Sequence, residues 1–323
     1  MCNSGDFIIF LISICSPSSD LKKTDIFIIN PHESLFYDVY CYHQGGYYMQ
    51  ELKRQKMPTG IESLDPILDG GVPPGSVILL IGDLGAGNNE FVYSSLVNTL
   101  NVRKGSAPGG IIVPKEVRYV SFTRSKEDVK QEIINSLNIE GLQHLVDTIR
   151  FDDLSDHYFD DSIVPDEWYS TGDIKTRMQM RSGHESIFVQ LSKVIDAALP
   201  DSLVVLDSVT EITTQCNTPA LWNNLTGFLR GLQRVAKQRR ITLYLLISRG
   251  ILDSSKEKEL ADIADAVLLF KWEESPGARR QRVMYFEKFR GVMPHLEERD
   301  LVKFAVSIST TSGFEVSNIR VVI

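Results

Sequence analysis

The chain has 323 residues, of which 43% are hydrophobic and 24% charged, and its net charge at pH 7 is −8. These proportions are ordinary for a globular protein, and a chain of this length can bury a core without disulfide or metal cross-links. The acidic balance excludes a molecule built as a whole for charge-driven binding to nucleic acid or anionic membranes, although it leaves room for a local basic patch.

Residues 1–48 differ in composition from the rest of the chain. They hold three of the four cysteines and five of the eleven tyrosines, and they show no sustained helical or strand period. Gly-Gly-Tyr-Tyr before Met49 can be encoded by a ribosome-binding sequence and its spacer. Two interpretations stay open: residues 1–48 are a translated leader ahead of a true start at Met49, or they are a real, poorly ordered extension.

Neither the cysteines nor the apolar run at 7–15 predicts secretion. The four cysteines form no CxxC pair and have no histidine at metal-ligand spacing, so free thiols in a reducing compartment are expected. No Lys or Arg precedes the run 7–15, no small-residue cleavage site follows it, and it is far shorter than the ~20 residues that span a bilayer. We therefore expect a cytoplasmic protein that makes no use of a membrane.

The stretch 57–100 predicts a phosphate-binding loop. Glycines and prolines at 70–75 mark a turn-rich approach, and the apolar run 76–81 is typical of a buried parallel strand. The glycine-rich sequence 82–89 follows at once, and 91–100 has helical spacing of its apolar residues. A strand, a glycine loop and a helix in this order let backbone N–H groups converge on phosphate. The residues expected at the site are Gly82, Asp83, Leu84, Gly85, Ala86, Gly87, Asn88 and Asn89.

The middle of the chain alternates between strands and helices. A second strand is predicted at 117–122, and Ser125 with Asp128 resembles a capping box that opens a helix to about Leu137. The acidic and aromatic segment 151–175 has no clear period, and it is either a solvated excursion or a partner-docking loop. A helix with one apolar face is predicted at 184–199.

A second candidate site residue stands at the end of another apolar strand. The run 203–206 leads into Asp207, where a Walker-B carboxylate orders water around Mg²⁺. Thr218 and Pro219 then begin a helix, as expected of a cap followed by proline in the first turn. Its apolar residues at helical spacing are expected in the core: Leu221, Leu225, Phe228, Leu229, Leu232 and Val235.

The remaining segments complete an α/β pattern. Buried strands are predicted at 241–248 and 264–270, and the tail alternates in the manner of antiparallel hairpins. We therefore predict an α/β fold with a mostly parallel central sheet, flanking helices and a C-terminal antiparallel extension. Residues 49–323 contain no internal repeat and are predicted to form a single domain.

At this point the sequence resembles the RecA superfamily of P-loop ATPases and, within it, the KaiC-like family. The segments that carry the resemblance are 59–76, 82–89, 203–208 and 286–291. The resemblance implies a RecA-like fold in which ATP with Mg²⁺ lies between neighbouring subunits of a ring or filament. It also implies that Lys288 and Arg290 reach the neighbour's phosphates; a solvated strand of alternating charge is the alternative for this pair.

Three departures from the family pattern fall in one site. The family's loop ends in Gly-Lys-Thr/Ser, whereas Gly87 is followed here by Asn88 and Asn89. A charge-assisted hydrogen bond contributes about 1.5–3 kcal/mol, so loss of the lysine weakens affinity about tenfold to a hundredfold. Asn89 and Asp207 are the predicted Mg²⁺ ligands, with the amide a poorer ligand than the hydroxyl. The family's acidic residues after the second strand are absent, and Arg124 there either replaces the missing positive charge or is a plain surface residue.

The sequence therefore predicts a pseudo-ATPase that binds ATP weakly or not at all. Its expected role is that of a regulatory or scaffolding subunit that assembles with itself or with an active paralogue through a RecA-type interface. A recombination accessory protein that binds single-stranded DNA is the main alternative, and an ATPase with a rebuilt site is another. The DNA alternative depends on basic residues at 277–282 and on four in one helix: Arg234, Lys237, Arg239 and Arg240.

Overall fold

The computed structural model describes residues 55–103, 110–160, 162–165, 168–169, 186–275 and 279–318, together with the backbone of four short strands before residue 50. The chain divides into two units, Met1–Arg54 and Gln55–Ile323. The first unit holds an antiparallel sheet of strands in sequence order: β1 (Ile8–Ile9), β2 (Phe27–Ile29), β3 (Tyr40–His43) and β4 (Gly46–Met49). The sequence pattern did not indicate these strands, and the proposed start of translation at Met49 stays a prediction.

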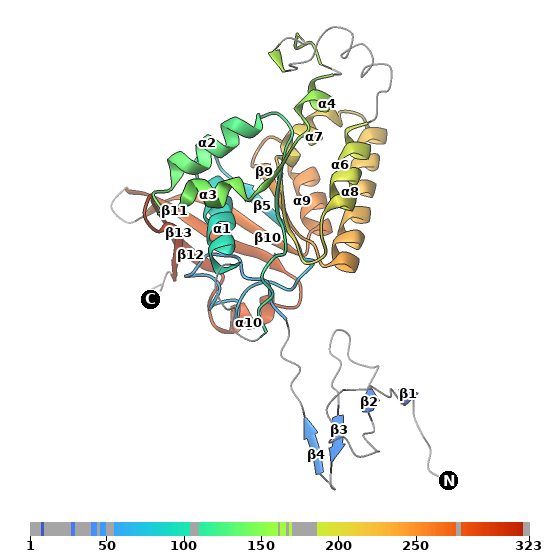
Figure 1. The fold of residues 1–323 in the computed structure, drawn as a ribbon, viewed down its shortest axis with the longest axis vertical. Helices are drawn as coiled ribbons and strands as arrows, with labels where there is room; N and C mark the ends of the chain where they lie inside the picture. The colour runs from blue at the N-terminus through green and yellow to red at the C-terminus, as the bar shows by residue number, and fades with distance from the viewer. Residues whose placement is uncertain are drawn as a thin grey trace. The chain divides into compact units, whose positions relative to one another are not determined.

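A nine-stranded sheet forms the second unit, in the order β13-β12-β11-β10-β5-β9-β8-β6-β7 (Figure 1). The parallel strands are β5 (Val77–Gly82), β6 (Val117–Ser121), β7 (Arg150–Asp153), β8 (Leu203–Asp207) and β9 (Thr242–Ser248). The antiparallel extension follows as β10 (Ala266–Ser275), β11 (Arg279–Phe289), β12 (Lys303–Ser309) and β13 (Gly313–Asn318). Strand β10 joins the two parts, because its first half pairs parallel with β5. The predicted α/β fold is confirmed.

Helices cover both faces of this sheet (Figure 1). One face carries α1 (Asn88–Arg103), α2 (Lys126–Ser136), α3 (Leu142–Asp147) and α10 (Met293–Glu298). The other carries α6 (Ile187–Ala197), α7 (Val209–Gln215), α8 (Pro219–Arg239) and α9 (Ser254–Ile263). Strand β5 serves both cores, since Ile78 and Leu80 face the first set of helices while Leu79 and Ile81 face the second. Within the described part of the chain, no helix combines the length and apolar character needed to cross a bilayer.

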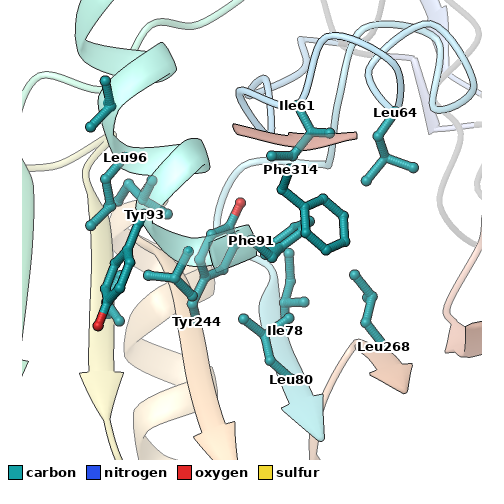
Figure 2. Close-up of a cluster of buried hydrophobic side chains, with 14 of the residues drawn as sticks. Ile61, Leu64, Ile78, Leu80, Phe91, Tyr93, Leu96, Tyr244, Leu268 and Phe314 are labelled. Carbon is teal, nitrogen blue, oxygen red and sulfur yellow. The ribbon is translucent and has the colours of Figure 1, made fainter. Parts of the chain in front are cut away.

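The helix after the glycine loop is anchored by aromatic packing (Figure 2). The ring centroid of Phe91 lies 5.3 Å from that of Phe314, 5.5 Å from that of Phe270 and 5.9 Å from that of Tyr244. Rings at these separations interact beyond simple area burial. The start of α1 is thereby fixed against the parallel sheet and the last hairpin at once.

The segment before β5 also anchors α1. The carboxylate of Asp65 accepts hydrogen bonds from the backbone N–H and hydroxyl of Thr59, both at 2.7 Å, and from the N–H of Gly60 at 3.1 Å. Asn98 of α1 donates to the Gly60 carbonyl at 2.8 Å. A β-carbon on Gly60 would lie 2.5 Å from the Ser95 carbonyl oxygen, so only glycine permits this approach.

Two predictions about local structure need correction. Leu221 was expected in the core but is 41% exposed, because the first turn of α8 buries Trp222 instead; the Trp222 indole N–H donates to Glu259 of α9 at 2.7 Å. The segment 151–175 was read as irregular, but its start belongs to β7 and is followed by the helix α4 (Ser155–Phe159). Residues 161, 166–167 and 170–175 lie outside the described part of the chain.

Strand β7 is polar because it supplies a partner for a buried charge. Arg118 of β6 has a side chain that is 1% exposed, and it pairs with Asp152 at 3.0 Å and with Glu116 at 3.2 Å. Buried charges persist in proteins when they are paired and hydrogen-bonded. Burial raises the pKa of Asp152, while the neighbouring Arg118 lowers it.

Candidate nucleotide site

The candidate site lies where the parallel strands end. Ser121 at the end of β6 pairs with Asp207 at the end of β8, and Gly82 at the end of β5 pairs with Ser248 of β9. The carboxyl ends of parallel strands share one edge of a sheet, which is the usual place for ligands in α/β folds. The fold therefore brings the glycine loop and Asp207 to the same edge.

The glycine loop connects β5 to α1. Gly85 and Gly87 have φ angles of +69° and +110°, which residues with a side chain rarely adopt. The Ala86 N–H donates to the Asp83 carbonyl at 2.9 Å, which closes the turn, and Leu84 at its tip is 98% exposed. A β-carbon on Gly87 would lie 2.9 Å from Cδ1 of Ile308 in β12. The C-terminal hairpin thus packs directly against the loop.

The two asparagines at the start of α1 bind each other. The Nδ2 of Asn88 donates to Oδ1 of Asn89 at 3.3 Å. A β-carbon on Gly82 would lie 2.5 Å from Oδ1 of Asn88, so this side chain folds back over the end of β5. The amide oxygen that was predicted to meet a metal is therefore the acceptor of a hydrogen bond within the pair.

Side chains from the sheet bind the carbonyls and the carboxylate of the loop. The indole N–H of Trp272 in β10 donates to the Leu84 carbonyl at 3.1 Å, and Nε of Arg282 in β11 donates to the Gly85 carbonyl at 3.0 Å. Arg249, after β9, pairs with the Asp83 carboxylate at 3.1 Å. Sequence reasoning missed Trp272 and Arg249 and read Arg282 only as part of a basic run. No local pattern indicates contacts between residues that lie 166 to 197 positions apart.

Asp207 takes part in a cluster of charged and hydroxyl groups. Its Oδ2 accepts hydrogen bonds from the Tyr119 hydroxyl and from the Arg124 guanidinium. Arg124 also pairs with Glu132 of α2 and donates to the Tyr93 hydroxyl of α1 at 3.4 Å. We call these five residues the Arg124 cluster. Among the described residues, the hydrogen-bond partners of the Arg124 guanidinium all lie in this cluster, and its charge lies beside Asp207 and Glu132.

Burial sets the protonation states in the Arg124 cluster. Burial raises the pKa of the Tyr93 and Tyr119 hydroxyls above their usual range, and the Asp207 carboxylate raises that of Tyr119 further. Both hydroxyls therefore stay protonated and can donate. Burial alone lowers the pKa of Arg124, but contact with Tyr119 and Asp207 outweighs it and raises the pKa above the ordinary value. Arg124 therefore stays charged.

Lys288 and Arg290 lie beside the end of α9, where β10 and β5 begin, whereas the glycine loop follows the other end of β5. The Lys288 Nζ donates to the carbonyls of Ala261 and Asp262 at 2.9 and 2.8 Å, and Arg290 donates to the Asp262 carbonyl at 2.6 Å. Cations at a helix C-terminus satisfy carbonyls that have no partner within the helix. Burial lowers the pKa of Lys288, as does the nearby Arg290. Their predicted role toward a neighbouring subunit stays a prediction.

The basic residues of α8 mostly bind the chain itself. Lys237 pairs with Asp265 at 2.8 Å, Arg240 with Asp201 at 2.7 Å, and Arg239 donates to the Ile195 carbonyl at 2.9 Å. Of the other basic run, residues 277–278 lie outside the described part of the chain, while the guanidinium groups of Arg280 and Arg282 lie over the Trp272 ring. Binding to single-stranded DNA stays a prediction.

Comparison with known proteins identifies the family. A family model described as "ATPase: KaiC" matches residues 57–302. The chain belongs to the KaiC family of ATPases. It is 27% identical over 224 residues to the circadian clock protein KaiC2 of Synechocystis sp., an alignment that covers 68% of this chain and 34% of that protein. The chain thus spans about a third of this relative's length.

A solved structure supports the fold. The chain is similar to a KaiC-like protein from the hyperthermophilic archaeon Pyrococcus horikoshii, with a TM-score of 0.54 and 16% identity, over 82% of this chain and 99% of that one. At this identity the likeness bears on the fold. The mostly parallel sheet and the antiparallel C-terminal strands described above agree with a KaiC-like fold.

KaiC ATPases use ATP with Mg²⁺, and the residues here fit the metal poorly. Arg124 neutralises the carboxylate of Asp207, and the Asn89 amide oxygen accepts from Asn88. Hard cations such as Mg²⁺ favour free carboxylate and hydroxyl oxygens. Among the residues described, no three His, Cys, Asp or Glu side chains gather in a way that could hold a metal ion.

Proposed function

We propose that this member of the KaiC family is a pseudo-ATPase that acts as a regulatory or scaffolding subunit. The observation that carries the proposal is the ion pair between Arg124 and Asp207. An ATPase needs the carboxylate at the end of this strand to order the metal and its water. Here a guanidinium already neutralises that carboxylate, so ATP with Mg²⁺ is bound weakly or not at all.

The residues that follow β6 support slow or no hydrolysis. The run from Ser121 to Arg124 contains no carboxylate that could activate an attacking water. Glu132 brings a carboxylate to the same cluster, but Arg124 binds it. Asn88 in place of lysine also removes a charge that would stabilise the phosphates in the transition state.

The test is phosphate release by the full chain with excess Mg-ATP. The matched control is Asp207→Asn, which removes the carboxylate at the end of β8 and reveals any contaminating activity. We expect wild type and this control to release phosphate at the same rate. We expect Asn88→Lys/Asn89→Thr/Thr123→Glu/Arg124→Glu, which restores the family's residues, to exceed both. Release by wild type that Asp207→Asn abolishes would overturn the proposal.

The scaffolding part of the proposal concerns assembly with a second copy or with an active paralogue. It is supported by membership of the KaiC family and by an intact sheet and loop without the usual chemistry. Lys288 and Arg290 would then serve a partner's phosphates from a chain whose own site is inactive. Sedimentation velocity with and without ATP should give the same assembly in both conditions. A chain that stays monomeric, and that leaves an active paralogue's hydrolysis rate unchanged, would contradict this part.

A further inference from the structure

In a P-loop ATPase, a loop lysine and a bound Mg²⁺ ion meet the phosphates. The residues of this chain depart from that pattern at both places. The loop lysine is Asn88, and the carboxylate that would help hold Mg²⁺ is engaged by Arg124. The loop nevertheless has positive φ angles at Gly85 and Gly87. Turns with such angles can gather successive backbone N–H groups into a concave site that binds anions. A different cation, Arg282, lies against this same loop.

Arg282 comes from β11 and is bound directly to the loop. Its Nε donates to the Gly85 carbonyl at 3.0 Å, and its Cδ lies 3.8 Å from the position that a β-carbon on Gly87 would occupy. No described residue is recorded as an acceptor for its two terminal nitrogens. The guanidinium therefore reaches the loop with N–H donors left for a ligand.

Stacking fixes the direction of this guanidinium. The Arg282 guanidinium carbon lies 4.5 Å from the ring centroid of Trp272, and that of Arg280 lies 4.3 Å from the same ring. The Trp272 indole is itself bound to the loop through the Leu84 carbonyl. A stacked arginine loses less conformational entropy when it binds an anion, and its planar donors suit phosphate oxygens.

The one carboxylate in the loop is neutralised. Asp83 pairs with Arg249 at 3.1 Å and accepts from the Trp272 backbone N–H at 3.4 Å. Its negative charge is therefore offset where an anionic ligand would approach. The charges around the loop therefore favour an anionic ligand, although the net charge of the whole chain is negative.

We propose that the loop takes the polyphosphate of a nucleotide without Mg²⁺, with Arg282 as the cation that meets the phosphates. This inference rests on the proposed loss of the metal-dependent ATPase site and names the ligand class that the altered site would accept. Free ATP carries more negative charge than Mg-ATP, so an arginine without a metal favours the free form. Removing one charge-assisted contact should weaken binding about tenfold to a hundredfold.

Calorimetry of the full chain tests this inference with ATP in EDTA and with ATP in excess Mg²⁺. Inorganic triphosphate serves as a third probe, because it shows whether phosphate alone is recognised. We expect binding of ATP in EDTA to be at least as tight as in Mg²⁺. Arg282→Gln should weaken it about tenfold or more. The matched control Arg280→Gln, which changes an arginine that also lies over the Trp272 ring, should stay within about threefold.

The outcomes separate this inference from the proposed function. No binding of ATP or triphosphate at millimolar concentration, or equal binding by wild type and Arg282→Gln, overturns the inference and leaves the pseudo-ATPase proposal intact. Mg²⁺-dependent binding with phosphate release overturns both. If Arg282→Gln does not fold, Arg282→Lys is the second variant, because it keeps the positive charge but lacks Nε. Arg282→Lys should retain most of the affinity for ATP. A loss of affinity as large as that expected for Arg282→Gln would contradict the role of the charge.

Discussion

The glycine loop and the Arg124 cluster lie at one edge of one sheet, yet they differ in what holds them. The loop is shaped by backbone: positive φ angles at Gly85 and Gly87, and packing of the last hairpin against it. The Arg124 cluster is shaped by side chains, with Asp207 held by a guanidinium and a tyrosine hydroxyl. Backbone conformation thus holds one region, and contacts between side chains hold the other.

The largest expected effect concerns the Arg124 cluster. Arg124→Met leaves Asp207 and Glu132 without their cation, and the Asp207 side chain is only 10% exposed. Breaking a buried pair from one side is strongly destabilising, and because the Arg124 side chain is 30% exposed we expect a loss of about 2–4 kcal/mol in the free energy of unfolding. Urea denaturation measures it.

A surface ion pair supplies the control for this substitution. Arg230 and Glu259 lie 3.9 Å apart with side chains 56% and 37% exposed, so Arg230→Met should cost less than about 1 kcal/mol. Arg124→Met/Asp207→Asn should recover part of the single loss, since it removes both charges. Equal, small effects of Arg124→Met and Arg230→Met would mean that the cluster does not stabilise the fold.

The next effect concerns the backbone of the loop. Gly87→Ala should destabilise by about 2–3 kcal/mol, because an added β-carbon meets Ile308 at 2.9 Å and the φ of +110° disfavours any side chain. Gly85→Ala is the matched control: its φ is +69°, and nothing lies within 4 Å of the added carbon, so about 1 kcal/mol is expected. Equal losses would show that packing by β12 does not hold the loop.

Restoring the loop's polar residues should have an intermediate effect on binding. Asn88→Lys/Asn89→Thr should raise Mg-ATP affinity about tenfold, which is about 1.4 kcal/mol, because lysine adds a charge-assisted contact. The gain stays modest while Arg124 neutralises Asp207, and adding Arg124→Glu should enlarge it. Calorimetry that finds no gain in either variant would mean that the loop no longer presents its N–H groups to phosphate.

The smallest effect concerns the hydrogen bond from the Trp272 indole to the loop. Trp272→Phe keeps an aromatic face for Arg280 and Arg282 but removes the indole N–H that donates to the Leu84 carbonyl. One hydrogen bond contributes about 0.5–1.5 kcal/mol, so thermal or urea denaturation should show a loss of this size. Trp222→Phe, which removes the bond to Glu259, should cost a similar amount at a site far from the loop. A loss well above this range would show that stacking depends on the indole.

Local patterns in the sequence predicted the parts of this fold that depend on local contacts. The apolar strands, the glycine loop and the Thr218 cap, which accepts the Leu221 N–H at 3.3 Å, follow from spacing and residue type. Strand β7 was not predicted, because most of its residues are polar. The reason for that polarity is the buried Arg118 of the neighbouring strand, which pairs with Asp152 of β7. The reading of Leu221 as core failed for a similar reason, since helical spacing alone does not show which neighbouring helix packs nearby.

The candidate site was predictable only in part. Asp207 and the loop could be placed from strand ends, because parallel strands bring them to one edge. The partners of Arg124 could not, because Tyr93, Tyr119 and Glu132 come from three different elements whose mutual orientation no local pattern indicates. Trp272 and Arg282 likewise reach the loop only through the pairing of β10 with β5 and β11.

Electron paramagnetic resonance of Mn²⁺ with ATP and the full chain tests the central claim most directly, because Mn²⁺ reports the Mg²⁺ position. The account predicts that wild type adds no protein-bound manganese signal, whereas Asn88→Lys/Asn89→Thr/Arg124→Glu gains one. A bound signal in wild type that disappears in Asp207→Asn would contradict the account, because Asp207 would then hold a metal despite Arg124.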